Sequence, residues 1–461
     1  MTIAKRLARH PSLAAYLLFL TALATPAAHS QVSPSASPQH AGFRYTVPPS
    51  KPTAVQITTL PNALCTLRSP DDSRDSKHSL TIFSDSEGAA RFFANPSKRS
   101  EQPVRVVVEC TAEGQSASYD VELRADPVPT REMPAPSVTK MPVPKDASIR
   151  PALTETEALR LSDEELVKRH YPVPPSQKEF PAAYRAWVKA ISVPVLMIPP
   201  KFVYNPNLTH KPLPENSDYK TQNDPIWSGM ELRGAAGSYA WIQGSWIVPA
   251  VNAEHGFYER NDSATWIGID GVGTSDFVQC GTEQQAYRVF WIQFTSYDAW
   301  TNFYPQVENA PMLSNFSVNP GDEIYSQISI ANAGGAPDLS GAFASYYMED
   351  TNSSGGSVAT EIYTPVGTTA VSGEDAEWIE ERPSTCPDTA KCPNPVDLAN
   401  YGTVSITGAV ARRPNAPDRG GYVGCCGAGS YILTITSGAE ILSTVAVIDD
   451  SDMKFTWHAY H

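Results

Sequence analysis

Lysine is scarce in the second half of the chain. From Pro225 onward only Lys391 and Lys454 occur, and 9 Lys and Arg face 27 Asp and Glu, a balance of −18. The residues before Pro225 hold 26 basic and 22 acidic residues, a balance of +4. A nucleic-acid-binding surface needs the opposite sign, so we expect no nucleic-acid partner. The pattern predicts an acidic second half kept in solution by its charge, preceded by a basic segment.

The motifs of several enzyme classes are missing as well. No His-Glu-x-x-His sequence and no clustered Cys/His spacing occurs, so a zinc site is not expected. The chain has no Gly-x-Ser-x-Gly elbow and no glycine-rich phosphate loop. We therefore expect neither a metal nor a cofactor.

Long apolar runs are lacking after residue 30, so we expect no membrane span. Residues 1–30 have the features of a signal peptide: a basic start, the apolar run Leu13–Leu23 and a small-x-small cleavage site at Ala28-His29-Ser30. We expect a secreted protein, periplasmic or extracellular. Export permits disulfides among the seven cysteines, and we predict one bridge, Cys65–Cys110.

Composition divides the rest of the chain. Residues 31–50 are rich in Ser, Pro, Ala and Gln, which predicts disorder. Alternating runs in 51–125 predict a small antiparallel β-domain. Residues 126–224 read as a proline-rich linker and a helical prosegment. There, Ser162-Asp163-Glu164-Glu165 has the form of a capping box, and the stretch 182–191 is amphipathic.

Residues 225–461 change character. Short runs of aromatic and β-branched residues recur, broken by Gly, Asn, Ser and Asp, and helix caps are nearly absent. About a dozen strands fit a single large antiparallel sandwich, so the fold class we predict is all-β.

Several motifs in this last domain occur together. They are Trp266-Ile267-Gly268-Ile269-Asp270-Gly271, Val278-Gln279-Cys280-Gly281, Tyr297-Asp298-Ala299-Trp300, Tyr304-Pro305 and Asp375-Ala376-Glu377-Trp378-Ile379. Their order resembles the signature of the glutamic peptidases, the eqolisins, over roughly residues 222–460. The resemblance implies two highly curved packed sheets, a concanavalin-like jelly roll, and peptide-bond hydrolysis by a glutamine and a glutamate on neighbouring strands.

Carried over by position, the resemblance makes Gln279 and Glu377 the catalytic pair. Trp266, Trp300 and Tyr304 would line the substrate cleft, and Asp270 and Asp298 would support the pair by hydrogen bonding. For the aromatic residues, core packing is the alternative. The sequence departs from the pattern where Cys280 follows the glutamine, and where Thr301-Asn302-Phe303 replaces a stretch with an acidic residue.

The chemistry of the two residue types suits this reaction. A glutamate can take a proton from water and return it to the leaving amine. A neutral amide can donate a hydrogen bond to the developing oxyanion. Because a carboxylate base works best near its ordinary pKa, we predict a secreted endopeptidase, active in acid on protein or peptide substrates.

Two other functions fit the aromatic β-sandwich. In a glycosidase, Asp270 and Glu377 would be paired carboxylates across a groove. In an inactive binding module, the aromatic residues would only hold a ligand, carbohydrate included. Neither gives Gln279 a role. We further expect a monomer made as a precursor, in which residues 151–224 cover the cleft as an intramolecular inhibitor released in acid.

Overall fold

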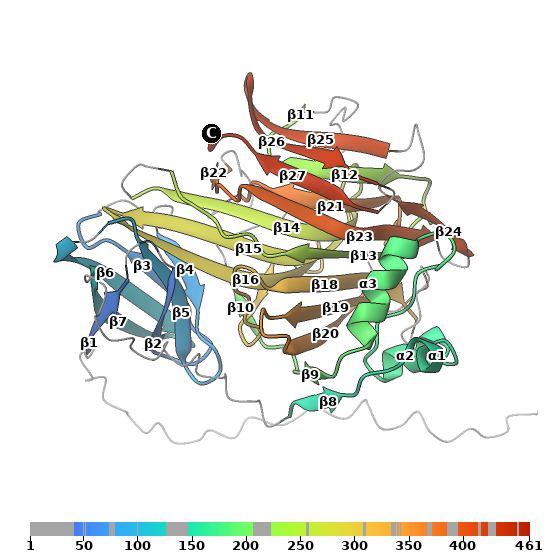
Figure 1. Cartoon of the computed structure of the whole chain (residues 1–461), viewed down its shortest axis with the longest axis horizontal. Coiled ribbons are helices and arrows are strands. Elements are labelled where there is room, and N and C mark those ends of the chain that lie inside the picture. The colour runs from blue at the N-terminus through green and yellow to red at the C-terminus, as the bar shows by residue number, and fades with distance from the viewer. Residues whose placement is uncertain are drawn as a thin grey trace, which may run out of the picture. The chain divides into compact units, whose positions relative to one another are not determined.

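The structure is a computed structural model. It describes residues 41–461 except 49, 51, 73–78, 99, 126–145, 206–222, 255–257, 308–309, 333–337, 339–340, 342, 367–370, 385–394, 414–415, 423–429 and 450. The predicted signal peptide, the predicted linker and Cys386, Cys392, Cys425 and Cys426 lie outside these residues. Within the described part, nearly all regular structure is β-strand, which confirms the predicted all-β class (Figure 1).

A small sheet of five strands begins the described chain, in the order β1–β7–β6–β3–β4. Its strands are β1 (Ala41–Val47), β3 (Leu64–Arg68), β4 (Leu80–Phe83), β6 (Ser100–Ala112) and β7 (Gln115–Ala125). The predicted disulfide Cys65–Cys110 is confirmed and joins β3 to β6. The prediction that residues 31–50 are disordered is wrong for residues 41–47. These residues form β1, which pairs with β7, and the rings of Phe43 and Tyr45 stack on each other.

Two larger sheets follow. The front sheet runs β25–β12–β21–β14–β15–β16–β5–β2, with β10, β17 and β22 added beside it. Its strands are β2 (Thr53–Thr58), β5 (Ala89–Pro96), β10 (Phe202–Tyr204), β12 (Trp227–Arg233), β14 (Arg260–Asp270), β15 (Phe277–Val289), β16 (Ile292–Tyr304), β17 (Pro311–Leu313), β21 (Asp375–Glu381), β22 (Asp397–Leu398) and β25 (Ser430–Ser437).

The back sheet runs β8–β9–β20–β19–β18–β13–β23–β27–β26–β25, with β24 beside β23 and β11 beside β25. Its strands are β8 (Ser148–Arg150), β9 (Val195–Met197), β11 (Asn223–Asp224), β13 (Trp241–Ile247), β18 (Glu323–Ala331), β19 (Phe343–Thr351), β20 (Ser357–Pro365), β23 (Thr403–Arg413), β24 (Ala416–Tyr422), β26 (Glu440–Val447) and β27 (Met453–Trp457). Strand β25 pairs with both β12 and β26, so the two sheets join at this edge.

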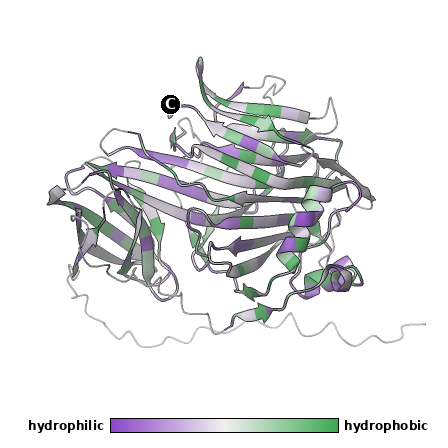
Figure 2. Ribbon diagram, in the orientation of Figure 1, coloured by the Kyte–Doolittle hydropathy of each residue, from purple (hydrophilic) through white to green (hydrophobic). Residues whose placement is uncertain are grey.

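The main core lies between the front and back sheets. Every second residue of the long strands points inward, and Figure 2 shows the resulting alternation of apolar and polar positions. Two buried indoles bridge the sheets, because Trp246 donates to Thr282 Oγ1 at 3.0 Å and Trp378 donates to the carbonyl of Gln243 at 2.8 Å. This arrangement confirms the predicted two-sheet sandwich.

In the described part of the chain three helices lie between β8 and β9: α1 (Glu155–Ala158), α2 (Asp163–Lys168) and α3 (Pro181–Ile191). The predicted capping box at the start of α2 is present, and α3 buries the predicted apolar side. The residues of that side pack against α1 and α2, in one cluster with Ala158 and Leu166. A different side of α3 packs on the outer face of the back sheet, where Ala183 meets Trp241 and Val410. Figure 1 shows α3 beside β13 and β23.

The prosegment prediction is therefore wrong for α1–α3, because α3 covers the back sheet, with α1 and α2 packed on it, instead of a cleft in the front sheet. Strand β10 lies beside the front sheet, where Val203 packs in one cluster with Trp266 and Trp300, so for residues 202–204 the cleft-covering role stays a prediction. Residues 206–222 of the predicted inhibitor lie outside the described residues. None of the described helices is both long and apolar enough to cross a bilayer.

Candidate active site

Gln279 and Glu377 meet on the outer face of the front sheet. Gly268, on β14, pairs in register with Gln279 on β15 and with Glu377 on β21. Residues directly opposite one another in antiparallel strands point to the same face. Since Trp378 points into the sandwich core, Glu377 and its row point outward. Two side chains that are 98 positions apart in the sequence, Gln279 and Glu377, thus lie in one row across a central strand.

Gly268 keeps the space between them open. A Cβ atom at this position would lie 2.8 Å from the ring of Phe277, 3.0 Å from the ring of Trp266 and 3.2 Å from Glu377 Oε2. Strands two apart in a sheet are separated by about 9–10 Å, so the flanking side chains must lean over the middle strand to meet. A glycine on that strand leaves them room to do so.

The carboxyl group of Glu377 is fully buried. Neither of its oxygens has a hydrogen-bond partner among the described residues. Desolvation raises its pKa well above the usual range, and the nearby carboxyls of Asp375, Glu231 and Asp270 raise it further. Burial likewise raises the pKa of Asp375 to about 8. In this closed state Glu377 holds its proton through the acid range.

Positive charge beside this carboxyl cluster comes from Arg233. Its guanidinium pairs with Glu231, with Nη2 3.1 Å from Oε2, and lies 4.3 Å from the ring centre of Tyr431. Oxygens of Glu231, Asp375 and Glu377 lie within 4.8 Å of one another, a spacing that also suits a divalent cation. The raised pKa values favour protons at these oxygens in acid.

Asp270 contacts the strand of Glu377 through the backbone. Glu377 and Gln279 are the predicted catalytic dyad. The carboxylate of Asp270 accepts hydrogen bonds from the amides of Gly373 and Glu374, both at 2.7 Å, just before β21 begins. These bonds fix the start of the strand that carries Glu377. Both oxygens of Asp270 are engaged by backbone amides, so this carboxyl group does not face a substrate as the second catalytic group of a glycosidase, and that alternative loses its proposed pair.

Asp298 does not lie beside the dyad. It is half-buried on β16, opposite Glu283 on β15 and four residues before Asn302, roughly 13 Å along the strand. Desolvation raises its pKa to about 7. The direct hydrogen-bonded support implied by the family resemblance is therefore absent in this structure. Asp298 lies on the same face of the front sheet as Gln279, but it is too far along β16 to form a hydrogen bond with Gln279 or Glu377.

The aromatic residues flank the dyad in two rows. Trp266 and Trp300 are fully buried one row away from the Gln279 row, in an apolar cluster on the same outer face. The indole of Trp266 donates to Glu381 Oε2 at 2.8 Å. Tyr304 is half-buried and pairs with Phe277 on the other side of the dyad row. Their burial in an apolar cluster is typical of core residues, and their position on either side of the Gln279 row is also that expected for the walls of a substrate cleft.

Sequence reasoning missed the charged neighbours Glu231, Arg233 and Asp375 and also Asn302. Asn302 stands directly opposite Gln279 in the β15–β16 register, is 1% exposed, and has no side-chain hydrogen bond within the described part of the chain. The sequence feature that could have pointed to Asn302 is that Thr301-Asn302-Phe303 lacks the acidic residue of the family pattern. A second neutral amide therefore stands beside Gln279 on the outer face of the front sheet.

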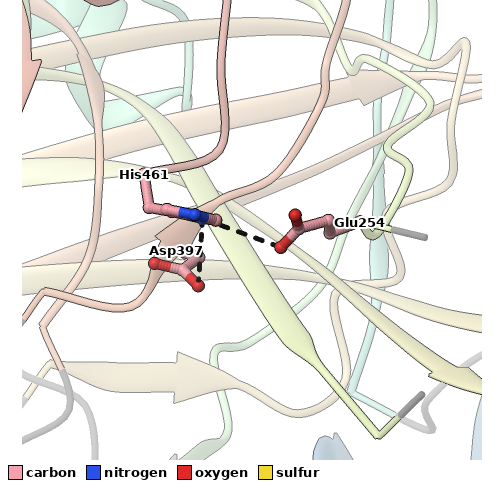
Figure 3. A group of neighbouring side chains, drawn as sticks. All are labelled: Glu254, Asp397 and His461. Carbon is pink, nitrogen blue, oxygen red and sulfur yellow. Dashed lines mark ion pairs between the residues drawn. The ribbon is translucent and has the colours of Figure 1, made fainter. Parts of the chain in front are cut away.

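Another titratable group lies at the opposite end of β14. Figure 3 shows His461 between Glu254 and Asp397, with Nδ1 3.6 Å and 3.8 Å from their carboxylate oxygens. Asp397 also forms an ion pair with Arg382, with 3.0 Å between Oδ1 and Nη2. Its backbone lies opposite Asn261 where β22 pairs with β14. The group ties the C-terminal residue to the front sheet and is separate from the dyad.

The chain is similar to one family of known proteins and to several solved structures. The model of the Peptidase A4 family matches residues 225–457, just over half of the chain. Crystal structures of scytalido-glutamic peptidase with a peptide-based transition-state analogue and of SCP-B, an eqolisin, with the tripeptide Ala-Ile-His are also similar. Each shares 16% identity over 51% of this chain and 99% of its own, with TM-scores of 0.39 and 0.38. No curated protein matches. The family match is the stronger finding, and the chain accordingly belongs to the Peptidase A4 family, the glutamic peptidases or eqolisins.

Proposed function

We propose that this glutamic peptidase hydrolyses internal peptide bonds in acid with Glu377 as general acid and base and Gln279 as oxyanion donor. The main support for this proposal is the row formed by Glu377, Gly268 and Gln279. In this row a carboxyl and an amide stand on the same face of the sheet, on either side of a glycine that has no side chain. Peptide is the substrate class because the family consists of peptidases.

The proposed reaction uses this space in two steps. Glu377, ionised once water enters, takes a proton from that water as its oxygen attacks the carbonyl carbon. The oxyanion accepts a hydrogen bond from the Gln279 amide, worth about 3–4 kcal/mol for one such donor. Glu377 then gives the proton to the amine as the C–N bond breaks. Both side chains are fully buried here, so substrate must open the face before reaction.

An acid optimum follows from the surrounding carboxyls. Glu231, Asp270 and Asp375 all have raised pKa values because of burial. In acid these three groups stay neutral, and Glu377 has taken the proton from water when the oxyanion develops, so none of the four carboxyl groups then carries a negative charge. As pH rises they ionise and repel the oxyanion, and the rate falls. Secretion, directed by residues 1–30, and a monomeric state remain parts of this proposal.

Glu377→Gln tests the assignment most directly. The change keeps shape and burial but removes the base, so we expect the rate of peptide cleavage to fall on the order of 10²–10⁴-fold. Purified variant and wild type are compared by mass spectrometry of a denatured protein substrate between pH 3 and 6. The matched control is Glu440→Gln, which makes the same change at an exposed turn. A folded Glu377→Gln protein with near-wild-type cleavage would overturn the proposal.

A further inference from the structure

Residues 41–125 are outside the part of the chain that the family model matches. Yet they are built into the front sheet. Strand β5 pairs with β16 from Ile292↔Pro96 to Thr295↔Phe93, and β2 pairs with β5, so two N-terminal strands extend the sheet that carries the dyad. Residues 40–461 accordingly form one compact unit.

A shared apolar core holds the two parts together. Tyr287, Val289, Ile292 and Phe294, from the hairpin of β15 and β16, are fully buried in one cluster with the N-terminal core. The rings of Phe92 and Phe294 lie 5.9 Å apart. Loss of residues 41–125 would expose these four side chains to water. Burying each large apolar side chain contributes about 1.5–3 kcal/mol, so separation is costly.

Strand β4 lies against the outer face of the front sheet. The amide of Thr81 donates to Gln285 Oε1 at 3.0 Å, and its carbonyl accepts from Ser296 Oγ at 2.8 Å. Gln285 and Ser296 pair with each other across β15 and β16. The contacts therefore place β4 on the same face as Gln279, about three rows farther along the strands.

Phe83, at the end of β4, brings the N-terminal part closer to the dyad. It belongs to the cluster that contains Trp266 and Trp300, and Leu64 of β3 packs against the same cluster. These two tryptophans are one row from the dyad, about 7 Å along the strands. Phe83 and Leu64 thus stand at the Trp300 side of the proposed substrate-binding face.

We propose that residues 41–125 stay in the working enzyme and that Phe83 and Leu64 wall off one end of the substrate-binding face. This inference rests on the proposed function and names what limits its substrate. The wall restricts how many peptide residues bind beyond the scissile bond on the Trp300 side. Phe83 is a specificity-determining residue and takes no part in the reaction itself.

Phe83→Ala tests the wall. Two peptide series, lengthened stepwise on the amino or the carboxyl side of one cleaved bond, are assayed for kcat/KM. In the wild type we expect kcat/KM to stop rising after a short extension on one side. In the variant we expect longer peptides on that side to gain on the order of tenfold, a difference of about 1.4 kcal/mol. The other series should be unchanged.

Phe43→Ala is the matched control, because β1 and β4 are the opposite edges of the small sheet. Length profiles that are identical in wild type, Phe83→Ala and Phe43→Ala would overturn the wall. If the profiles agree while Glu377→Gln is inactive, the wall fails and the proposed function stands. Activity of Glu377→Gln would instead reject the proposed function.

Retention of residues 41–125 has its own test. A recognition site for a specific protease is placed within residues 126–145 of the full chain, which is then cut and passed over a sizing column. We expect the two fragments to elute together at the mass of the uncut chain, with activity retained. Separation of the fragments with full activity in the larger one would show that residues 41–125 are dispensable.

Discussion

The buried carboxyl of Glu380 should make the protein less stable as pH rises. Glu380 lies in the core between the sheets, is 0% exposed and accepts a hydrogen bond from Thr265 Oγ1 at 2.7 Å. Desolvation raises its pKa to about 8, whereas a glutamate in an unfolded chain titrates near 4.3. The folded state therefore holds the Glu380 proton between about pH 4.3 and 8, where the unfolded state releases it.

The sign and size of the effect follow from this difference. Stability contributed by the protonated group is fully present below about pH 4.3 and is lost as pH rises through about 8. The folded and unfolded pKa values differ by about 3.7, which at 1.36 kcal/mol per pH unit corresponds to roughly 5 kcal/mol. Glu380→Gln is neutral at every pH. We expect it to match the parent at pH 4 and to exceed it by up to about 5 kcal/mol at pH 8.

Thermal unfolding followed by circular dichroism from pH 4 to 8 measures this. Both proteins carry Glu377→Gln, so that self-digestion does not interfere. At roughly 2 °C per kcal/mol for a large domain, the difference in Tm should grow to about 10 °C. Glu440→Gln, exposed at a turn, should follow the parent throughout. Parallel pH profiles for Glu380→Gln and the parent would refute the reasoning.

Three further changes test other parts of the structure. Gly268→Ala should lower kcat at least tenfold in a folded protein, because its Cβ would press on Phe277 and Glu377 Oε2; unchanged kcat in a peptide assay would contradict this. Gln279→Glu should lose more activity at pH 5 than at pH 3, because an ionised carboxylate repels the oxyanion; a pH-independent loss would argue against the oxyanion role. Trp187→Ala should lower the free energy of unfolding by about 3–5 kcal/mol without activating the enzyme, since Trp187 packs α3 against α1 and α2 and not over the dyad; activation would restore the inhibitor hypothesis.

Much of the local structure could be read from the sequence. Alternation predicted the strands, the capping residues predicted α2, and the amphipathic pattern predicted the buried side of α3. The Cys65–Cys110 bridge was predicted because both cysteines lie in β-rich stretches. The ordered motifs around Gln279 and Glu377 predicted the family, which the family model confirms. These features depend on a few neighbouring residues or on short motifs, so the sequence alone carries them.

Only the tertiary structure decided how these parts face one another. Alternation tells which side chains share a face of a strand, but not which strand lies next to it or what covers that face. Hence Asp298 was expected beside the dyad although the register sets it four residues away. For the same reason Asn302 was overlooked, the segment with α3 was expected to cover the cleft, and the β5–β16 pairing was not anticipated. Sheet register and the packing of distant segments are set by the whole folded chain, because each strand finds its partner through contacts that no local pattern specifies.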